Sequence, residues 1–301
     1  MKKPTVKRSA KAKVRGTSTP GWARRAAKVS TQTLVVALVI LLVVLNGLPF
    51  VWGVLTSLKS EQDLFRFPPA FFDFAPTLDN YHRVAATGFF GNMLTSFIYC
   101  VVAVITVVVV GLPAAYAFDR YSFPLRRPLF LLIIASIPLS IGAAALLIPT
   151  YIYFVRLGLT NTPYVLPLIY AAHQLPMTIW ILKGAVESIP HELDEAAIVD
   201  GISRVGLLWR IVLPLSRPAL AAASILAFVG TWNEFVAGSV MVDSPQLKPI
   251  QPLVYGFIGF FGREWGPLTA SATLAMLPIL FIFILFGRQF VAGLTKGAVK
   301  G

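Results

Sequence analysis

Long stretches without a charged residue constrain this chain more than any other feature of its sequence. Residues 33–58 contain no charge, which is enough helix to cross the apolar core of a bilayer, about 30 Å thick. Backbone groups in lipid must find partners within the protein, and the apolar–polar alternation of a membrane barrel is absent. The sequence therefore predicts an all-α membrane protein with six transmembrane helices, at 33–58, 93–118, 128–155, 163–182, 218–242 and 265–287.

The distribution of Lys and Arg predicts the orientation of these helices. Basic residues concentrate in the loops and tails on the cytoplasmic side of membrane proteins. With the N-terminus inside, 20 of the 26 basic residues fall on the inner side, in segments 1–32, 119–127, 183–217 and 288–301. Both termini are therefore expected in the cytoplasm, the last segment as a C-terminal tail.

The first 32 residues form a basic arm without hydrophobic periodicity, which predicts disorder. Contact with anionic lipid and retention on the inner face explain the arm more simply than binding to nucleic acid. The single cysteine, Cys100, lies in an apolar run, and His and Cys residues do not cluster with metal-ligand spacing. We expect no bound metal and no catalytic site.

Two outer segments are more than plain connectors. Residues 59–92 are rich in Phe and Pro and are expected to lie along the membrane interface. Residues 243–264 contain an apolar patch bounded by prolines. This second segment either packs back onto the helices or meets a partner outside the membrane.

The inner segment carries an unusual concentration of acids. Five of the 13 acidic residues lie between Glu187 and Asp200. Pro190 is typical of a helix start, Ser188 is a candidate cap, and acids in the first turns suit the helix dipole. Gly201 is suited to a left-handed turn that ends the helix.

A second short helix is expected after this turn. Ser203 is its candidate cap, Pro214 its end, and Pro218 the start of the next spanning helix. Four apolar residues fall on one face by their spacing: Val205, Leu208, Trp209 and Val212. Either the segment is a solvated loop, or the ends of the protein's own helices or a partner protein cover this face.

The spacing of residues in this segment resembles the EAA motif of permeases from binding-protein-dependent ABC importers. The match consists of Glu195, Ala196, Ala197, Gly201, Ile211, Leu213 and Pro214. From residue 31 to 301 the chain is similar to sugar-importer permeases of the MalG type. Further matching stretches are ESIPHELDEAAIVDG, WNEF at 232–235, EWG at 264–266 and RQFVAGLTKGAVKG at the C-terminus, with Glu264 standing where an aspartate is expected.

The resemblance implies a type I ABC importer permease fold in the cytoplasmic membrane. Its segment 184–217 would be the loop that couples the permease to a cytoplasmic ABC ATPase dimer, with Glu195 paired to a basic residue of the ATPase. Glu192 and Asp200 are placed in the same coupling site. The resemblance also implies a second homologous permease subunit and an extracytoplasmic solute-binding protein, which segment 243–264 should contact. The tail 288–301 should reach toward the ATPase dimer.

Polar residues inside the apolar runs are candidates for the translocation path. Glu234 is an acid inside a spanning run, where a charge is costly unless it faces protein or water. It either bonds a neighbouring helix or lines the path with Trp232 and Asn233. His173 and Gln174 lie between two prolines and are either packing residues or part of a broken-helix site.

The chain is therefore predicted to be a transport subunit and not an enzyme. It has no G-x-x-x-x-G-K-[ST] motif, so ATP and Mg²⁺ are expected in the partner ATPase. The expected cargo is a di- or oligosaccharide, with glycerol-phosphate-type solutes as the alternative, and the sequence does not identify the sugar. An ion-driven secondary transporter would have more intramembrane charge, and a membrane enzyme would need a nucleophile–base or carboxylate pair.

Overall fold

The fold is almost entirely helical. It was obtained as a computed structural model, which describes residues 21–141, 144–259 and 262–298. In chain order the elements are α1 (Gly21–Ser57), α2 (Glu61–Leu64), α3 (Asp79–Ala86), α4 (Phe89–Arg120), α5 (Arg126–Ile141), α6 (Ala144–Arg156), α7 (Val165–Glu187), α8 (His191–Val199), α9 (Arg204–Leu207), the π-helical turn η1 (Leu208–Val212), α10 (Leu213–Leu215), α11 (Arg217–Trp232), α12 (Val236–Val240), α13 (Ile250–Gly256), β1 (Ile258–Gly259), β2 (Gly262–Arg263) and α14 (Trp265–Ala298).

The chain divides into two units, residues 1–52 and 53–301. In the first unit, helix α1 exposes nearly all of its apolar side chains from residue 32 onward, as a helix surrounded by lipid does. The prediction of a disordered arm up to residue 32 is wrong for residues 21–32. These residues are helical because they lack proline and are rich in Ala, Arg and Lys, which favour helix. Residues 1–20 of the arm lie outside the described residues.

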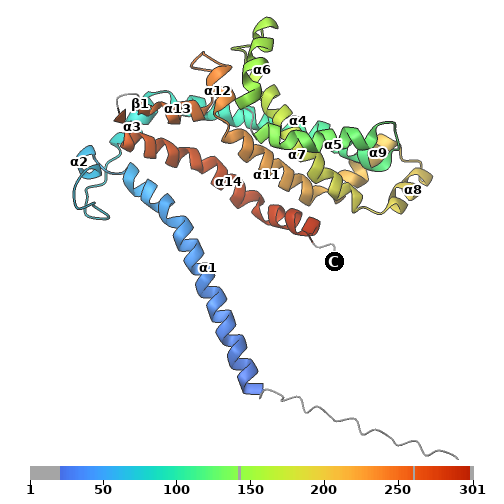
Figure 1. Cartoon of the computed structure of the whole chain (residues 1–301), viewed down its shortest axis with the longest axis horizontal. Coiled ribbons are helices and arrows are strands. Elements are labelled where there is room, and N and C mark those ends of the chain that lie inside the picture. Colours follow the sequence, from blue (N-terminus) through green and yellow to red (C-terminus); the bar gives the residue numbers. More distant parts are fainter. Residues whose placement is uncertain (1–20, 142–143, 260–261, 299–301) are drawn as a thin grey trace, which may run out of the picture. The chain divides into compact units, whose positions relative to one another are not determined.

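Five segments in the described part of the chain are long and apolar enough to cross a membrane: Gln32–Ser57, Phe89–Arg120, Val165–Glu187, Arg217–Val240 and Trp265–Val291. They correspond to five of the six predicted helices. The helix predicted over 128–155 is divided into α5 and α6, which contain Pro138 and Pro149. Each proline removes a backbone donor and weakens a continuous helix at its position. Figure 1 shows α6 turning away from the line of α5.

The long helices of the second unit pack side by side. Helix α4 lies along α7, and α11 contacts α4, α7 and α14 (Figure 1). The buried apolar residues that the structure describes form three clusters. One lies at the end that carries α8 and α9, and the other two lie toward the opposite end, one between α4 and the start of α7 and one between α4, α11 and α14. These clusters join the long helices to one another. The outward faces of the helices are apolar and exposed, as expected for contact with lipid or another subunit.

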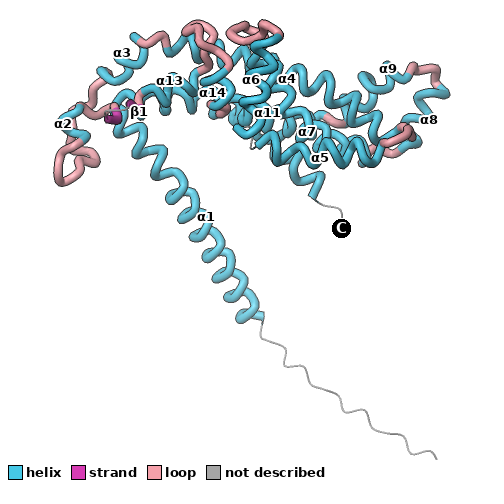
Figure 2. Tube along the Cα trace, turned by 45° about the horizontal axis from the view of Figure 1, so that its top comes forward, coloured by secondary structure: helices cyan, strands magenta, loops and turns pink. Residues whose placement is uncertain are grey.

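The short elements gather at opposite ends of the long helices (Figure 2). Helices α3 and α13 and the hairpin β1–β2 lie at one end, and α8 and α9 lie at the other. The sequence segment 243–256 packs back onto the bundle, because its backbone is bonded to side chains of α4. That outcome agrees with one of the two alternatives for this segment.

Gly266 allows close packing at the end of the bundle that carries α3 and α13. Its hydrogen faces the Asn80 side chain so closely that a Cβ in its place would collide with the Asn80 amide. Asn80 is buried and donates hydrogen bonds to the carbonyls of Ser57 and Lys59, both at 2.9 Å. A side chain at position 266 would therefore disturb the contact between α3, α14 and the residues that follow α1.

Candidate functional site

Helix α8 begins the acidic loop with a sharp change of backbone direction. Pro190 is extended, with φ −56° and ψ 137°, and the helix starts at His191. Glu192 and Asp194 fall in the first turn, where the positive end of the helix dipole favours them. The expectation that Ser188 caps this helix is wrong. Its hydroxyl donates to the Ala185 carbonyl of the preceding helix, at 2.7 Å, because α7 extends to Glu187.

The turn between the two short helices follows the sequence prediction. Gly201 has φ +79°, a left-handed conformation that is costly for residues with a Cβ. Ser203 then caps α9, because its hydroxyl accepts a hydrogen bond from the Gly206 N–H at 3.1 Å. Both residues act locally, so local sequence was sufficient to predict them.

The second helix of the loop differs from a regular amphipathic helix. Leu208 and Val212 are buried as predicted, but Val205 and Trp209 are 68% and 46% exposed. A π-helical turn, η1, precedes Pro214, and the Leu213 N–H donates to the Leu208 carbonyl. The π turn shifts Val212 away from the direction of Val205, and the buried face of the segment is the one that carries Leu207, Leu208 and Val212. The predicted apolar face is therefore half covered by the protein and half open.

Apolar packing fixes the covered half of the loop to the bundle. Leu207 and Val212 are fully buried, and Ala197 of α8 is 3% exposed. They share one cluster with Leu182 and Val186, near the end of α7. Burying a side chain of this size is worth about 1.5–3 kcal/mol, so the loop is an ordered part of the fold rather than a solvated connector.

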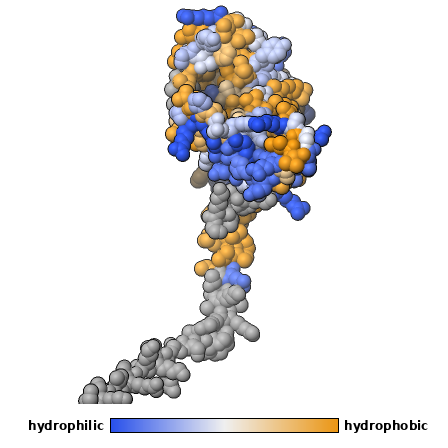
Figure 3. Space-filling model, turned by 90° about the vertical axis from the view of Figure 1, so that its right-hand side faces the viewer, coloured by the Kyte–Doolittle hydropathy of each residue, from blue (hydrophilic) through white to orange (hydrophobic). Residues whose placement is uncertain are grey.

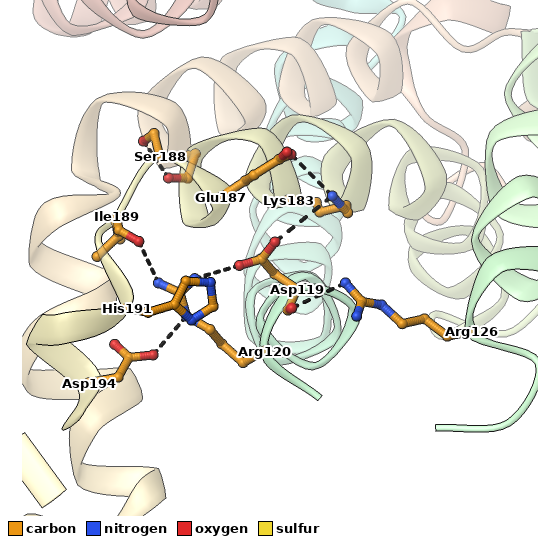
Figure 4. Close-up of polar contacts among 10 residues, drawn as sticks. Asp119, Arg120, Arg126, Lys183, Glu187, Ser188, Ile189, His191 and Asp194 are labelled. Atoms are coloured by element: carbon orange, nitrogen blue, oxygen red, sulfur yellow. Dashed lines mark hydrogen bonds and ion pairs between the residues drawn. The ribbon is translucent and has the colours of Figure 1, made fainter. Parts of the chain in front are cut away.

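A buried network of charges attaches the start of α8 to the end of α4 (Figure 4). Arg120 Nε donates to Asp194 Oδ2 at 2.7 Å, and Nη2 donates to the Ile189 carbonyl at 2.7 Å. Nη1 donates to Asp119 Oδ2 at 2.6 Å and lies 3.1 Å from His191 Nε2. The Arg120 and Asp194 side chains are only 5% and 12% exposed. Removing one partner of such a pair leaves a buried charge and costs about 3–5 kcal/mol.

Two further cations surround Asp119, the neighbour of Arg120. Arg126 Nη2 donates to the Asp119 carbonyl at 3.1 Å. Lys183 Nζ lies 4.0 Å from Asp119 Oδ1 and 3.1 Å from Glu187 Oε2. The network therefore joins the end of α4, the end of α7, the start of α5 and the start of α8.

Beside this network is a small pocket of about 200 Å³, between α8 and the end of α4. Asp194 Oδ1 is buried and has no hydrogen-bond partner among the described residues. On the far side, the Arg204 guanidinium lies 5.2 Å from the centre of the Tyr121 ring. A hydrogen bond to the Tyr121 side chain raises the pKa of Arg204 above its usual value, so this cation keeps its charge. The lining residues are Tyr116, Arg120, Tyr121, His191, Asp194, Glu195, Ile198 and Arg204.

The predicted coupling residues divide into an exposed edge and a packed side. Ala197 is buried, and Ile211, Leu213 and Pro214 are half-buried. The exposed members are Glu192, Glu195, Ala196, Asp200 and Gly201. Figure 3 views the molecule from the end that carries α8 and α9, where hydrophobic and hydrophilic surfaces lie side by side. The large exposed apolar side chains of the loop are Leu193, Ile198, Val199, Val205, Trp209 and Leu215.

The candidate path residues near the end of α11 have different surroundings. Trp232 is 2% exposed, stacks on Phe228 with ring centres 5.6 Å apart, and donates from Nε1 to the Ala275 carbonyl. Asn233 is exposed and its amide donates to the Val229 carbonyl of its own helix. Glu234 lies in a break between two helices.

The carboxylate of Glu234 caps α12. It accepts from the Ala237 N–H at 2.9 Å and from the Gly238 N–H at 3.3 Å. These are orphan donors of the first helical turn, and a negative group there is favoured by their partial charge. This contact explains how Glu234 is held. That Glu234 also lines the translocation path stays a prediction.

His173 and Gln174 lie in the uninterrupted part of α7, which continues through Pro176 to Glu187. Both side chains are half-buried. The Gln174 amide lies directly against Gly230 of α11, where a Cβ would collide with it. The structure thus brings Gln174 next to the helix that ends at Trp232, and leaves the role of both residues as a prediction.

Sequence reasoning missed Arg120 and Asp119. Both follow an apolar run, and their sequence neighbourhood does not distinguish them from ordinary charged residues of a loop. Asp194 was counted among the crowded acids, but its partner lies 74 residues earlier in the chain. Only tertiary structure reveals that pairing.

The comparisons with known proteins agree with this architecture. Residues 84–296 match the family model described as the binding-protein-dependent transport system inner membrane component. The chain belongs to this family. It is accordingly a multi-pass membrane permease subunit of a binding-protein-dependent ABC transporter, and such subunits are not themselves catalytic.

Relatives of this permease are named as transporters of carbohydrates. It is 34% identical over 264 residues to the sulfoquinovosyl glycerol transport system permease protein SmoH of Agrobacterium fabrum, covering 86% of this chain and 91% of that one. It is 31% identical over 280 residues to the trehalose/maltose transport system permease protein MalG of Thermococcus litoralis, covering 91% and 99%.

A solved structure shows the same fold. The permease resembles a chain in the crystal structure of a bacterial ABC transporter involved in the import of the acidic polysaccharide alginate. The TM-score is 0.72 at 19% sequence identity, covering 91% of this chain and all of that one. This likeness establishes the ABC importer permease fold.

Proposed function

We propose that this permease moves a di- or oligosaccharide across the cytoplasmic membrane, in an importer driven by a separate ABC ATPase dimer. ATP and Mg²⁺ are used by that ATPase. A second homologous permease completes the path, and an extracytoplasmic binding protein delivers the sugar. Relatives of this permease belong to trehalose/maltose and diacetylchitobiose transport systems, which supports the sugar class.

In this proposal the chain crosses the membrane six times, in a type I arrangement. The five long segments supply five crossings, and α5 with α6 supplies the other. Both termini then lie in the cytoplasm, as the distribution of basic residues predicts. The tail from residue 288 extends α14 toward the ATPase, and segment 243–264 faces the binding protein.

The observation that carries the proposal is the ordered loop with an open edge. Buried contacts hold Ala197, Leu207 and Val212 against the bundle, while Glu195 and Val199 face outward. An exposed apolar edge on an ordered loop is typical of a surface that binds a partner protein. We assign this edge to the ATPase, with Glu195 pairing to one of its cations.

The translocation path is assigned to the polar groups around the end of α11 and the facing part of α7. These are Asn233, Glu234, His173 and Gln174, together with Trp232, whose ring is buried against Phe228. Amide and imidazole groups can exchange hydrogen bonds with sugar hydroxyls.

Two substitutions test the coupling role. Glu195→Ala removes the exposed carboxylate, and Gly201→Asp places a charged side chain at φ +79°. In proteoliposomes that contain the whole importer, both variants should hydrolyse ATP but lose sugar uptake, while insertion of the permease is unchanged. Normal uptake in both variants would overturn the assignment of this loop.

A further inference from the structure

Helix α4 carries polar attachments at both of its ends. It runs without a break from Phe89 to Arg120, and residues 93–118 between the ends contain no charge. At 1.5 Å per residue, the rise from Asn92 to Arg120 is about 42 Å, close to the full thickness of a bilayer. One helix therefore reaches both membrane surfaces, with a different built contact at each.

The attachment at the outer end consists of four side chains that we call the outer clamp: Asn92, Thr95, Ser96 and Tyr99. Their spacing of three, four and seven residues places them on one face of the helix. Asn92 Nδ2 donates to the carbonyls of Pro245 and Lys248, both at 2.7 Å. The backbone of the outer segment is therefore bonded directly to α4.

The other members of the clamp extend this contact along the segment. Ser96 Oγ accepts from the Ile250 N–H at 2.6 Å, where α13 begins. Tyr99 Oη donates to the Leu247 carbonyl at 3.1 Å, and Thr95 Oγ1 to the Gln246 carbonyl at 3.3 Å. Since Asn92 and Ser96 are buried, releasing them would leave polar groups without water or partner.

The attachment at the inner end is Arg120. Its guanidinium bonds Asp194 in α8 and the Ile189 carbonyl just before α8, while Asp119 of α4 itself takes a third contact. A planar guanidinium can serve three acceptors in different directions, which a lysine ammonium at the same position cannot do equally well. The start of the coupling loop is thus fastened to α4 as well as to α7, from which the chain continues.

We propose that Arg120 and Asn92 are positioning residues that fasten α4 to the coupling loop at one end and to the outer segment at the other. Displacement of the loop by the ATPase then reaches segment 243–264 through α4. This inference rests on the proposed function, since it takes the ATPase as the source of motion. Figure 1 shows the two ends of α4 at opposite ends of the bundle.

A competing connection runs through α7. In the connection just before α7, the Asn161 side chain accepts from the Ser244 N–H at 2.9 Å, and the Asn161 backbone N–H donates to the Met241 carbonyl at 2.9 Å. If this contact alone carried the motion, removal of Asn92 would have no effect on the outer segment. The experiment below separates the two routes.

The test uses the complete importer, purified with its ATPase and second permease, and a nitroxide label on Ile258→Cys. Ile258 is 42% exposed in strand β1, and native Cys100 is buried, so the unsubstituted complex gives the labelling blank. The spectrum is recorded without nucleotide and after trapping with ATP and vanadate. The change between the two states measures how much motion reaches the outer segment.

Arg120→Gln and Asn92→Ala should each reduce this change at least fourfold, and the double variant should reduce it no further. Arg120→Lys should retain an intermediate change. Matched controls are Arg127→Gln, an exposed arginine of α5, and Thr106→Ala, whose hydroxyl donates to the Val102 carbonyl of its own helix. Both controls should keep the full change.

The outcomes separate the inference from the proposed function. A full change in either Arg120→Gln or Asn92→Ala overturns the inference and leaves the proposed function intact. No change in the parent complex overturns the proposed function, and the inference with it. If Arg120→Gln does not assemble with the ATPase, the Asn92→Ala complex decides, because Asn92 lies at the opposite end of α4 from the loop.

Discussion

Val199→Ala separates docking from folding at the coupling loop. Val199 is the most exposed of the loop's large apolar residues, at 86%, so its two branch methyls contribute little to the folded permease. Each buried CH₂-sized group is worth about 0.8 kcal/mol. If docking on the ATPase buries both methyls, their loss weakens association by about 1.6 kcal/mol, which is about 15-fold in Kd.

The effect on folding should have the opposite sign. Alanine is a better helix former than valine by a few tenths of a kcal/mol, and Val199 is the last residue of α8. The Tm of the purified permease should therefore stay the same or rise slightly. Affinity is measured with the permease pair in lipid nanodiscs and the ATPase subunit immobilised, and the Tm is measured on the same samples.

Two results would refute this reasoning. Unchanged affinity with unchanged Tm would show that the open edge of α8 does not contact the ATPase. A Tm lower by several degrees would show that Val199 is packed within the permease, contrary to its exposure.

Three further substitutions test other parts of the structure. Leu207→Ala removes a fully buried side chain and should destabilise the permease by about 2–5 kcal/mol, seen as a lower Tm; an unchanged Tm would contradict the loop packing. Gly266→Ala should displace the Asn80 amide and lower the Tm, and no such fall is expected if the contact is unimportant. Trp232→Phe keeps an aromatic ring but loses the hydrogen bond to the Ala275 carbonyl. This loss should lower stability by about 0.5–1.5 kcal/mol and leave the KM for uptake almost unchanged. A large change in KM at constant Tm would instead place the ring in the sugar path.

Local sequence signals predicted the parts of this protein that depend on local physics. Uncharged runs identified five spanning segments within a few residues, because the length of such a run is set by the bilayer itself. Gly201 and Ser203 were assigned correctly because a left-handed turn and a helix cap need particular residue types at one position.

Features that depend on tertiary structure were not predicted. Arg120 and Asp194 are 74 residues apart, and nothing in either neighbourhood marks them as partners. Val205 and Trp209 are exposed because the segment buries the face that carries Leu207, Leu208 and Val212 against the end of α7, and the spacing of apolar residues did not include Leu207. The cap that Glu234 provides depends on a break between Trp232 and Val236 that no proline marks.

The division of the predicted third span had a partial signal. Pro138 and Pro149 within 128–155 indicate a weakened helix, and the structure has two helices there. Proline alone does not set the boundary, because Pro113, Pro176 and Pro278 lie inside α4, α7 and α14 without ending them. Packing against neighbouring helices decides which prolines are tolerated.

The most direct test of the whole account is the composition of the complex that this permease forms in its native membrane. The intact complex should be purified through a tag on this subunit, and its components identified by mass spectrometry. We expect a second permease and an ABC ATPase, with the ATPase lost when Glu195→Ala and Val199→Ala are combined. A complex with full uptake activity and no ATPase subunit would contradict the account.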